Sequence, residues 1–259
     1  MTRSAIVCDL DGVIWRGHDP IAGAADAVDT LRASGRRVGF VTNNSGRTRA
    51  DVRTQLAACG ITTEDDDVLT SADAAAQLCA SALAPGSRVF ACAGEGVVQA
   101  LHAAGLHASR ALDAAVDADA VVVGWHNDFD FARLDAAANI ARSGRLFVAT
   151  NMDPTYPAES GRILPGGGAI VAAVATASGI TPLVAGKPEQ PTVDAVRARF
   201  GDAGVMVGDR VSTDGLLAAR LGWPFALVFS GVTQPDDDHG GAAIAAADLG
   251  ALVEWLQTH

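Results

Sequence analysis

Two carboxylates stand one residue apart where an apolar run near the N-terminus meets a glycine. Asp9 and Asp11 follow the run Ala5 to Cys8 and directly precede Gly12. Residues i and i+2 of a strand share one face, but a chain that leaves the strand at the glycine can aim one carboxylate at a substrate and keep the other beside it. Aspartate and glycine also suit an ordinary turn. Combined with further polar groups, the pair indicates a nucleophile and its acid/base partner.

Those further groups occur in three segments farther along the chain. In order they are Thr42, Asn43, Lys187, Asp209 and Asp214. A carboxylate nucleophile, a second carboxylate for acid/base work, a fixed cation and hydrogen-bond donors are what phosphoryl transfer through an aspartyl-phosphate requires. The ordered set therefore predicts this chemistry.

Each residue of the set has a predicted role. Asp9 attacks phosphorus, and Asp11 protonates the leaving alcohol and then activates the water that hydrolyses the acyl-phosphate. Lys187 supplies positive charge, while Thr42 and the Asn43 amide donate hydrogen bonds to the phosphoryl oxygens. A halide leaves without a proton, so a dehalogenase could dispense with an acid at position 11, whereas phosphate esters of alcohols need one.

A divalent cation is expected beside the nucleophile, because a carboxylate and an anionic phosphate otherwise repel each other. The side chains of Asp9 and Asp209 and the backbone carbonyl of Asp11 offer hard oxygen ligands that suit Mg2+. Asp214 is expected to pair with Lys187 or to orient a water on the metal. The alternative for Asp214 is that it caps the helical run that follows it.

The composition is typical of a globular cytoplasmic protein. The 259 residues are 49% hydrophobic, and no apolar stretch reaches the roughly 20 residues of a membrane helix. A formal net charge of −11 argues against nucleic acid or an anionic membrane as a partner. The phosphoryl chemistry predicted above makes a small phosphorylated metabolite the expected partner. The four cysteines lack the spacing of a disulfide framework or a zinc site.

Short β-rich runs alternate with Ala/Leu-rich helical runs along the chain. This alternation predicts a doubly wound α/β fold with a parallel sheet, in which ligands bind at the carboxyl ends of the strands. The expected strands are 5–8, 37–42, 88–91, 120–123, 146–149, 205–207 and 225–228, and the expected helices are 23–34, 48–59, 131–143, 168–178 and 191–200. The segments that contain Asp9, Thr42, Lys187 and Asp209 all lie outside residues 80–182. We therefore expect a catalytic core of residues 1–79 and 183–259 and an inserted α/β cap of residues 80–182.

With these motifs the chain resembles the haloacid dehalogenase superfamily and, more narrowly, its NagD-like branch, subfamily IIA. The matching text is Asp9-Leu10-Asp11-Gly12-Val13-Ile14-Trp15, Thr42-Asn43-Asn44-Ser45, Thr150-Asn151-Met152-Asp153-Pro154, Gly186-Lys187-Pro188 and Gly208-Asp209-Arg210-Val211-Ser212-Thr213-Asp214. The branch includes nitrophenyl phosphatases and phosphatases for phosphoglycolate, glycerol phosphate and pyridoxal phosphate. The resemblance implies a Rossmann-like core, a C2-type cap and Mg2+-dependent hydrolysis with Asp9 as nucleophile. Ser212 departs from the acidic or other polar residue common there, and we expect activity to survive that change.

Substrate choice is expected to lie in the cap, because the core contacts only the phosphate. Candidate substrate contacts are Asn44, Asn151, Asp153 and Tyr156. The same loop residues could instead hold a buried loop, and His126 lacks the second ligand that a metal role would need. Expected substrates are monoesters such as glycerol 3-phosphate, phosphoglycolate, p-nitrophenyl phosphate or nucleoside monophosphates.

Two other functions remain open at this point. A phosphotransferase or mutase would use the same core, and a non-catalytic metabolite-binding protein would not need the retained carboxylates. Homodimer formation through the caps is also open, because the apolar residues 168–177 suit either an interface or an intramolecular core.

Overall fold

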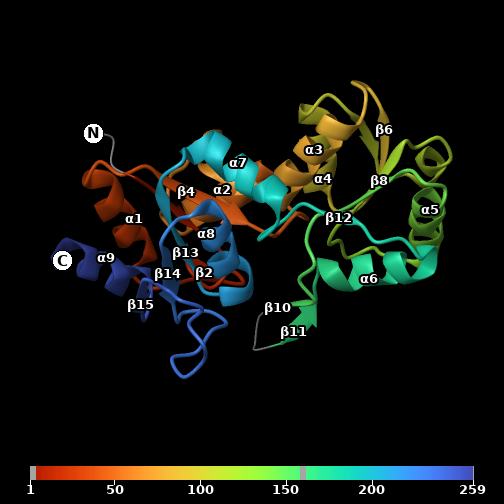
Figure 1. Cartoon of the computed structure of the whole chain (residues 1–259). Helices are drawn as coiled ribbons and strands as arrows, with labels where there is room; N and C mark the ends of the chain where they lie inside the picture. The colour runs from red at the N-terminus through yellow and green to blue at the C-terminus, as the bar shows by residue number, and fades with distance from the viewer. Residues whose placement is uncertain (1–3, 158–161, 259) are drawn as a thin grey trace.

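Two parallel sheets, each in its own lobe, organise the residues that the computed structural model describes, 4–157 and 162–258 (Figure 1). The core-lobe sheet contains β1 (Ala5–Cys8), β4 (Val38–Thr42), β5 (Val68–Thr70), β13 (Gly204–Gly208), β14 (Phe225–Val228) and β15 (Ile244–Ala246), in the order β15-β14-β13-β1-β4-β5. The cap-lobe sheet contains β6 (Arg88–Cys92), β7 (His107–Ser109), β8 (Ala120–Val123), β9 (Leu146–Ala149) and β12 (Leu183–Val184), in the order β12-β9-β8-β6-β7. These neighbours pair in parallel, which confirms the predicted fold class.

Helices cover both faces of each sheet. They are α1 (Ala24–Ala33), α2 (Arg49–Ala58), α3 (Ser71–Ala82), α4 (Glu95–Ala103), α5 (Phe131–Arg142), α6 (Gly167–Ser178), α7 (Gln190–Phe200), α8 (Leu216–Leu221) and α9 (Leu249–Thr258). Two short hairpins, β2 (Trp15–Arg16) with β3 (Asp19–Pro20) and β10 (Thr155–Pro157) with β11 (Ile163–Pro165), are antiparallel. None of the described helices is long and apolar enough to cross a lipid bilayer.

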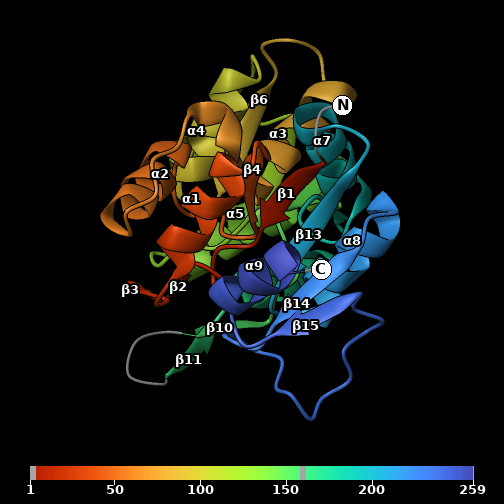
Figure 2. The same cartoon turned by 90° about the vertical axis from the view of Figure 1, so that its left-hand side faces the viewer.

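The central strand β1 is buried on both faces. Ile6 and Cys8 join one apolar cluster with residues of α1 and α9, and Ala5 and Val7 join a second with residues of α7 and α8 (Figure 2). A strand covered on both faces reads as a continuous apolar run, as this one does. Cys8 therefore packs in the core, where burial and the neighbouring Asp9 raise the pKa of its thiol to about 12.

The cap lobe has its own apolar clusters, one under α3 and α4 and one under α5 and α6. The predicted division at residues 79/80 and 182/183 stays a prediction, and the sheets suggest two adjustments. Leu183 and Val184 pair with Val148 and Ala149, so they lie in the cap-lobe sheet. The buried face of α3 packs in the cap-lobe cluster, because this Ala-rich helix continues the layer formed by α4.

The buried residues of α6 face their own lobe. Ile170, Val171 and Val174 pack in the cluster under α5 and α6, while Ala172 and Thr176 are exposed. The apolar character of this helix is thus largely that of an intramolecular core, and homodimer formation stays a prediction.

Candidate active site

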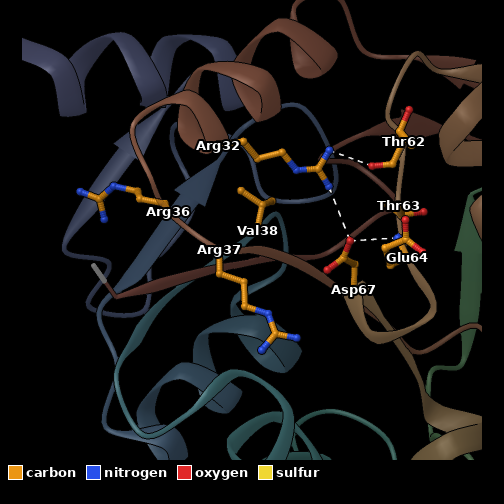
Figure 3. A pocket seen from close by; sticks show the side chains of 8 residues that line it. All are labelled: Arg32, Arg36, Arg37, Val38, Thr62, Thr63, Glu64 and Asp67. Atoms are coloured by element: carbon orange, nitrogen blue, oxygen red, sulfur yellow. Dashed lines mark hydrogen bonds and ion pairs between the residues drawn. The ribbon is translucent and has the colours of Figure 1, made fainter. Parts of the chain in front are cut away.

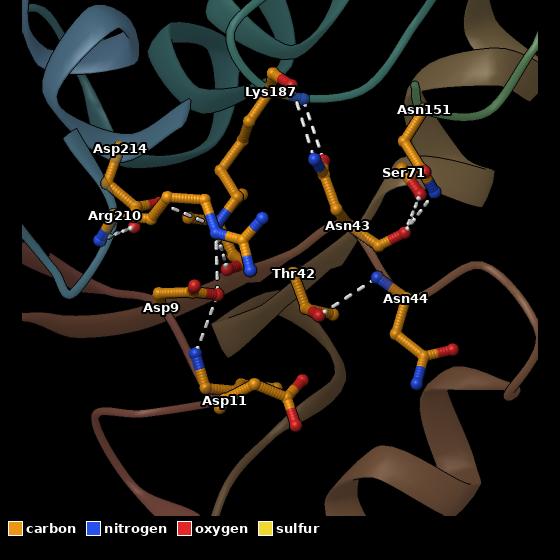
Figure 4. A network of polar contacts seen from close by, with 12 residues as sticks. Asp9, Asp11, Thr42, Asn43, Asn44, Ser71, Asn151, Lys187, Arg210 and Asp214 are labelled. Atoms are coloured by element: carbon orange, nitrogen blue, oxygen red, sulfur yellow. Dashed lines mark hydrogen bonds and ion pairs between the residues drawn. The ribbon is translucent and has the colours of Figure 1, made fainter. Parts of the chain in front are cut away.

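The carboxyl ends of three neighbouring core strands carry the predicted catalytic residues. Asp9 follows β1, Thr42 ends β4 and Asp209 follows β13. The Oδ1 atom of Asp9 accepts a hydrogen bond from the backbone N–H of Leu10 at 2.8 Å and lies 2.8 Å from Nζ of Lys187. Asp9 is therefore fixed in direction before any ligand binds (Figure 4).

Lys187, the only lysine in the chain, is buried between two carboxylates. Its Nζ lies 2.8 Å from Asp9 and 2.7 Å from Oδ1 of Asp214, and it also donates to the Val41 carbonyl at 3.4 Å. Burial lowers the pKa of Lys187, but Asp214 and Asp9 outweigh that effect and raise it above its usual value. The ammonium group therefore stays charged and fixed.

Asp209 and Asp214 complete an acidic trio with Asp9. Oxygens of the three side chains lie within 4.8 Å of one another, the only such group of three metal-binding side chains among the described residues. Val232 N–H donates to Oδ2 of Asp209 at 2.6 Å, and burial raises the pKa of both Asp209 and Asp214. Buried carboxylates that repel one another, with hard oxygen donors only, fit Mg2+ well.

Two observations sharpen the predictions for this trio. A Cβ atom on Gly231 would lie 1.9 Å from Oδ2 of Asp209, so only glycine leaves room for that carboxylate. Asp214 accepts from the Arg210 N–H at 3.1 Å and pairs with Lys187, and it does not cap α8, which begins at residue 216. The helix-capping alternative for Asp214 is therefore wrong, because its side chain points back toward the lysine.

Asp11 lies half-buried beside the nucleophile, on the turn that leads into the β2–β3 hairpin. Its Oδ1 accepts a hydrogen bond from Nε1 of Trp15 at 3.1 Å, and Gly12 makes the turn with φ +83°. Burial and then the charge on Asp9 raise the pKa of Asp11 to about 6. A carboxyl group with such a pKa can hold a proton near neutrality and give it to a leaving group.

The loop after β4 has two different functions. The Thr42 hydroxyl accepts from Asn44 N–H at 3.0 Å and keeps its own proton for a ligand. Asn43 instead links the lobes: its Oδ1 accepts from Lys187 N–H at 2.8 Å, and its Nδ2 donates to Asp153 Oδ2 at 3.0 Å and to the Lys187 carbonyl at 3.2 Å. The Asn43 side-chain amide is thus occupied within the protein, and phosphate binding by Asn43 stays a prediction.

A cleft of about 810 Å³ between the lobes is lined by Asp9, Asp11, Thr42, Asn43, Lys187 and Asp209, but not by Asp214. The candidate substrate contacts Asn44, Asn151, Asp153 and Tyr156 line it too. Asn151 also donates to the Asn43 carbonyl at 2.7 Å, so the buried-loop alternative holds for this residue at the same time. Tyr156 packs edge-on against Trp125, with ring centroids 5.6 Å apart at 88°.

Sequence reasoning missed several residues that line the cleft. They are Trp15, Arg16, His18, Arg47, Gln55, Arg162 and Arg210. Trp15 and Arg210 lie within the motifs quoted above and Arg47 lies close to one of them, so their positions could have drawn attention to them. Gln55 reaches the cleft from α2, and Arg16, His18 and Arg162 reach it through the two hairpins, whose direction no local pattern specifies.

Two other polar groups of the molecule lie outside this site. A smaller cavity of about 310 Å³ on the core lobe is lined by Arg32, Arg36 and Arg37 among others, and Arg32 there donates to the Thr62 carbonyl at 2.8 Å and pairs with Asp67 (Figure 3). In the cap, His126 lies 3.7 Å from the Cys92 sulfur and 2.9 Å from Asp128.

Comparison with known proteins gives a consistent picture. Residues 6–107 match the model of the haloacid dehalogenase-like hydrolases, and residues 184–252 match a second model of HAD-hydrolase-like proteins. The chain is 40% identical to a D-glycerol 3-phosphate phosphatase of Mycobacterium tuberculosis over 241 residues, which are 91% of this chain and 65% of that relative. It is 35% identical to human chronophin, covering 94% of this chain and 87% of that protein.

Solved structures agree with these relatives. A crystal structure of a glycerol phosphate phosphatase from Mycobacterium tuberculosis in complex with magnesium aligns with a TM-score of 0.87 at 37% identity, over 97% of this chain and 76% of that one. NagD from Escherichia coli K-12 aligns with a TM-score of 0.83 at 25% identity, over 96% and 98% of the two chains. The predicted enzyme class, a phosphoric monoester hydrolase, is confirmed by the phosphatases among these relatives.

Proposed function

The chain belongs to the haloacid dehalogenase-like hydrolase family and to its NagD-like branch, and we propose on that premise that it hydrolyses small phosphate monoesters through an aspartyl-phosphate on Asp9. One observation carries the proposal. The Lys187 ammonium bridges Asp9 and Asp214 at the base of a cleft large enough for a metabolite. A buried ion pair facing a cleft is costly unless it serves a ligand.

The first half-reaction uses two carboxylates in opposite protonation states. A carboxylate oxygen of Asp9 forms a bond to phosphorus while the bond from phosphorus to the ester oxygen breaks. Asp11 donates its proton to that oxygen, so the product leaves as a neutral alcohol. Lys187 and the Thr42 hydroxyl stabilise the charge on the phosphoryl oxygens.

The second half-reaction reverses the role of Asp11. Now a carboxylate, it takes a proton from a water molecule whose oxygen bonds to phosphorus, while the bond between phosphorus and Asp9 breaks. Phosphate is released, and both carboxylates return to their starting states. The Leu10 N–H and Lys187 contacts hold Asp9 in the same place for both steps.

A magnesium ion belongs to this proposal as a cofactor. The side chains of Asp9 and Asp209 and the backbone carbonyl of Asp11 would hold it, and it would neutralise charge on the phosphoryl group. Support comes from the acidic trio and from the magnesium complex of the mycobacterial phosphatase. The proposal includes a cytoplasmic location, a small phosphorylated metabolite as substrate and the formation of a homodimer.

Phosphate release from p-nitrophenyl phosphate and glycerol 3-phosphate tests the proposal, with Mg2+, with EDTA, and with EDTA followed by excess Mg2+. We expect activity that EDTA abolishes and Mg2+ restores. Activity that is unaffected by EDTA would remove the metal from the mechanism. Transfer of the phosphoryl group to an added alcohol with no free phosphate would instead favour a phosphotransferase.

The role of Asp11 has its own test. Asp11→Asn should lose turnover of glycerol 3-phosphate, whose alkoxide needs a proton, and keep a larger share of turnover of p-nitrophenyl phosphate, whose leaving group is a weak base. Equal losses on both substrates would exclude Asp11 as the acid.

A further inference from the structure

Arginine side chains are concentrated around the cleft of an acidic protein. The chain carries a formal net charge of −11, yet Arg16, Arg47, Arg162 and Arg210 all line the cleft. Nε of Arg16 donates to the Ser230 carbonyl at 2.6 Å, and Arg210 acts to lower the pKa of Asp209 against burial. Arg47 lines the cleft from the core lobe, and Arg162 lines it from the cap lobe together with the candidate substrate residue Tyr156.

Arg47 is held rigidly at the core side of the cleft. The Gly96 N–H donates to the Gly46 carbonyl at 3.4 Å, and a Cβ atom on Gly96 would lie 2.1 Å from the Arg47 carbonyl. The Arg47 guanidinium donates to Oε1 of Gln55, whose Nε2 donates to the Gly17 carbonyl at 2.9 Å. The backbone and the guanidinium group of Arg47 are thus both held in place, and the guanidinium keeps further N–H donors for a ligand.

Arg162 and Tyr156 stand opposite, on the β10–β11 hairpin of the cap lobe. Tyr156 pairs with Leu164 across the hairpin, and its ring is fixed by the edge contact with Trp125. Within residues 4–157 and 162–258, no hydrogen bond or ion pair engages the Tyr156 hydroxyl or the exposed Arg162 guanidinium. Both side chains line the cleft.

Arg47, Arg162 and Tyr156 line the same cleft as Asp11. Burial raises the pKa of Tyr156, and the charges of Arg162 and Arg47 act against that shift. Arg47 also acts to lower the pKa of Asp11. The cleft that contains the proposed acid therefore also contains these three groups, and the alcohol part of a substrate would lie there.

We propose that Arg47, Arg162 and Tyr156 form a subsite for a second anionic group, so that the preferred substrates are phosphate monoesters whose alcohol carries a carboxylate or a second phosphate. Guanidinium groups bind both anions through paired N–H donors, and two of them lining one cleft from opposite lobes would offset the repulsion that a net charge of −11 imposes on such a substrate. The proposal rests on the phosphatase function above and names its substrate class.

Two matched substrate pairs test it. Glycerol 3-phosphate and 3-phosphoglycerate differ in a hydroxymethyl against a carboxylate, and fructose 6-phosphate and fructose 1,6-bisphosphate differ by a second phosphate. We expect kcat/KM to favour the more anionic member of at least one pair by about tenfold or more, the size of a charge-assisted contact. The pair that shows the preference identifies the anion.

Arg47→Gln and Arg162→Gln should each reduce that preference about tenfold. Arg36→Gln on the core and Arg145→Gln on the cap make the same change of charge away from the cleft and should leave the preference intact. Equal kcat/KM within both pairs, or a preference that survives in both cleft variants, would overturn the subsite.

Binding to the Asp9→Asn protein separates the two proposals. Calorimetric titration with 3-phosphoglycerate and glycerol 3-phosphate, before and after Arg47→Gln, measures the subsite without turnover. If the anionic preference is present in binding but no substrate is hydrolysed by the unmodified chain, the phosphatase function fails and the subsite stands. If p-nitrophenyl phosphate is hydrolysed but neither binding nor turnover favours the anion, the subsite fails and the function stands.

Discussion

The core lobe and the cap lobe share one architecture but place different residues at the ends of their strands. In the core, β1 and β13 lead into Asp9 and Asp209, whereas in the cap β6 and β8 lead into Gly94 and Gly124. A Cβ atom on either glycine would lie 2.6–2.7 Å from the core loop at residues 45–46. The carboxyl edge of the core sheet therefore carries charged side chains. The corresponding edge of the cap sheet carries glycines, whose lack of a side chain lets the core loop at residues 45–46 pack closely against it.

The charges of the two lobes differ in the same way. The Lys187 and Asp214 side chains are 2% and 0% exposed, whereas the Arg88–Asp117 pair of the cap is 58% and 68% exposed. Exposed pairs contribute little to stability, but a buried charge that loses its partner is expensive. The site thus holds a buried ion pair that would be costly to break, whereas this cap pair stays in water.

Removal of the nucleophile should give the largest contrast between core and cap. Asp9→Asn eliminates the attacking oxygen, so we expect kcat for p-nitrophenyl phosphate to fall by about 10⁴-fold or more. Asp194→Asn, on the exposed face of α7, is the matched control and should keep full activity. Comparable rates in both variants would disprove the assignment of Asp9.

Breaking the buried ion pair should give the largest change in stability. Lys187→Met leaves two carboxylates buried without a cation, and we expect the free energy of unfolding to fall by about 3–5 kcal/mol at pH 7. Arg88→Met should cost at most about 1 kcal/mol, because its partner stays solvated. Urea unfolding of both variants measures the difference.

A compensating change makes that comparison more specific. Adding Asp214→Asn to Lys187→Met removes one unpaired charge and should recover part of the lost stability, though not activity. If the double variant is less stable than Lys187→Met alone, the loss comes from packing of the lysine stem and not from uncompensated charge.

The fit of the core loop against the cap can be tested at α4. Gly96→Ala places a methyl group 2.1 Å from the Arg47 carbonyl, so we expect a loss of about 1–3 kcal/mol and a higher KM. In an unconstrained helix the same change would stabilise by about 1 kcal/mol. Gln99→Ala, exposed in the same helix, is the control, and a more stable Gly96→Ala protein would show that the lobes are not in tight contact there.

Both lobes were predicted from sequence to a similar degree, and the length and burial of each element decided which ones were found. Apolar runs such as 5–8 and 225–228 gave strands at the predicted residues, because strands buried on both faces leave a continuous pattern. Strands β5, β7 and β12 were missed because a strand of two or three residues is too short to show the alternation of apolar and polar residues. Helix α3 was missed because its many alanine residues obscure the contrast between apolar and polar faces. Helix α4, of nine residues, was also missed.

In the site, the residues placed by local sequence could be predicted, and those placed by contacts distant in sequence could not. Asp9 and Asp209 could be predicted because each directly follows a strand. The use of Asn43 as a link to Asp153 could not be predicted, since it depends on how closely a residue 110 positions away approaches. Arg162 likewise reaches the cleft only through the pairing of β10 with β11, which no local pattern specifies.

The smallest predicted effect concerns pH and lies in the cap. Burial lowers the pKa of His126 below its ordinary value of 6.5, with Asp128 acting against that shift. Stability contributed by the neutral ring is therefore fully present above about pH 6.5 and is lost as the pH falls toward the lower folded-state pKa. The wild-type protein should lose more stability between pH 7.5 and 5.5 than His126→Gln, as measured by urea midpoints. Because acidic groups elsewhere titrate alike in both proteins, equal losses would mean that His126 is protonated as readily in the folded cap as in the unfolded chain.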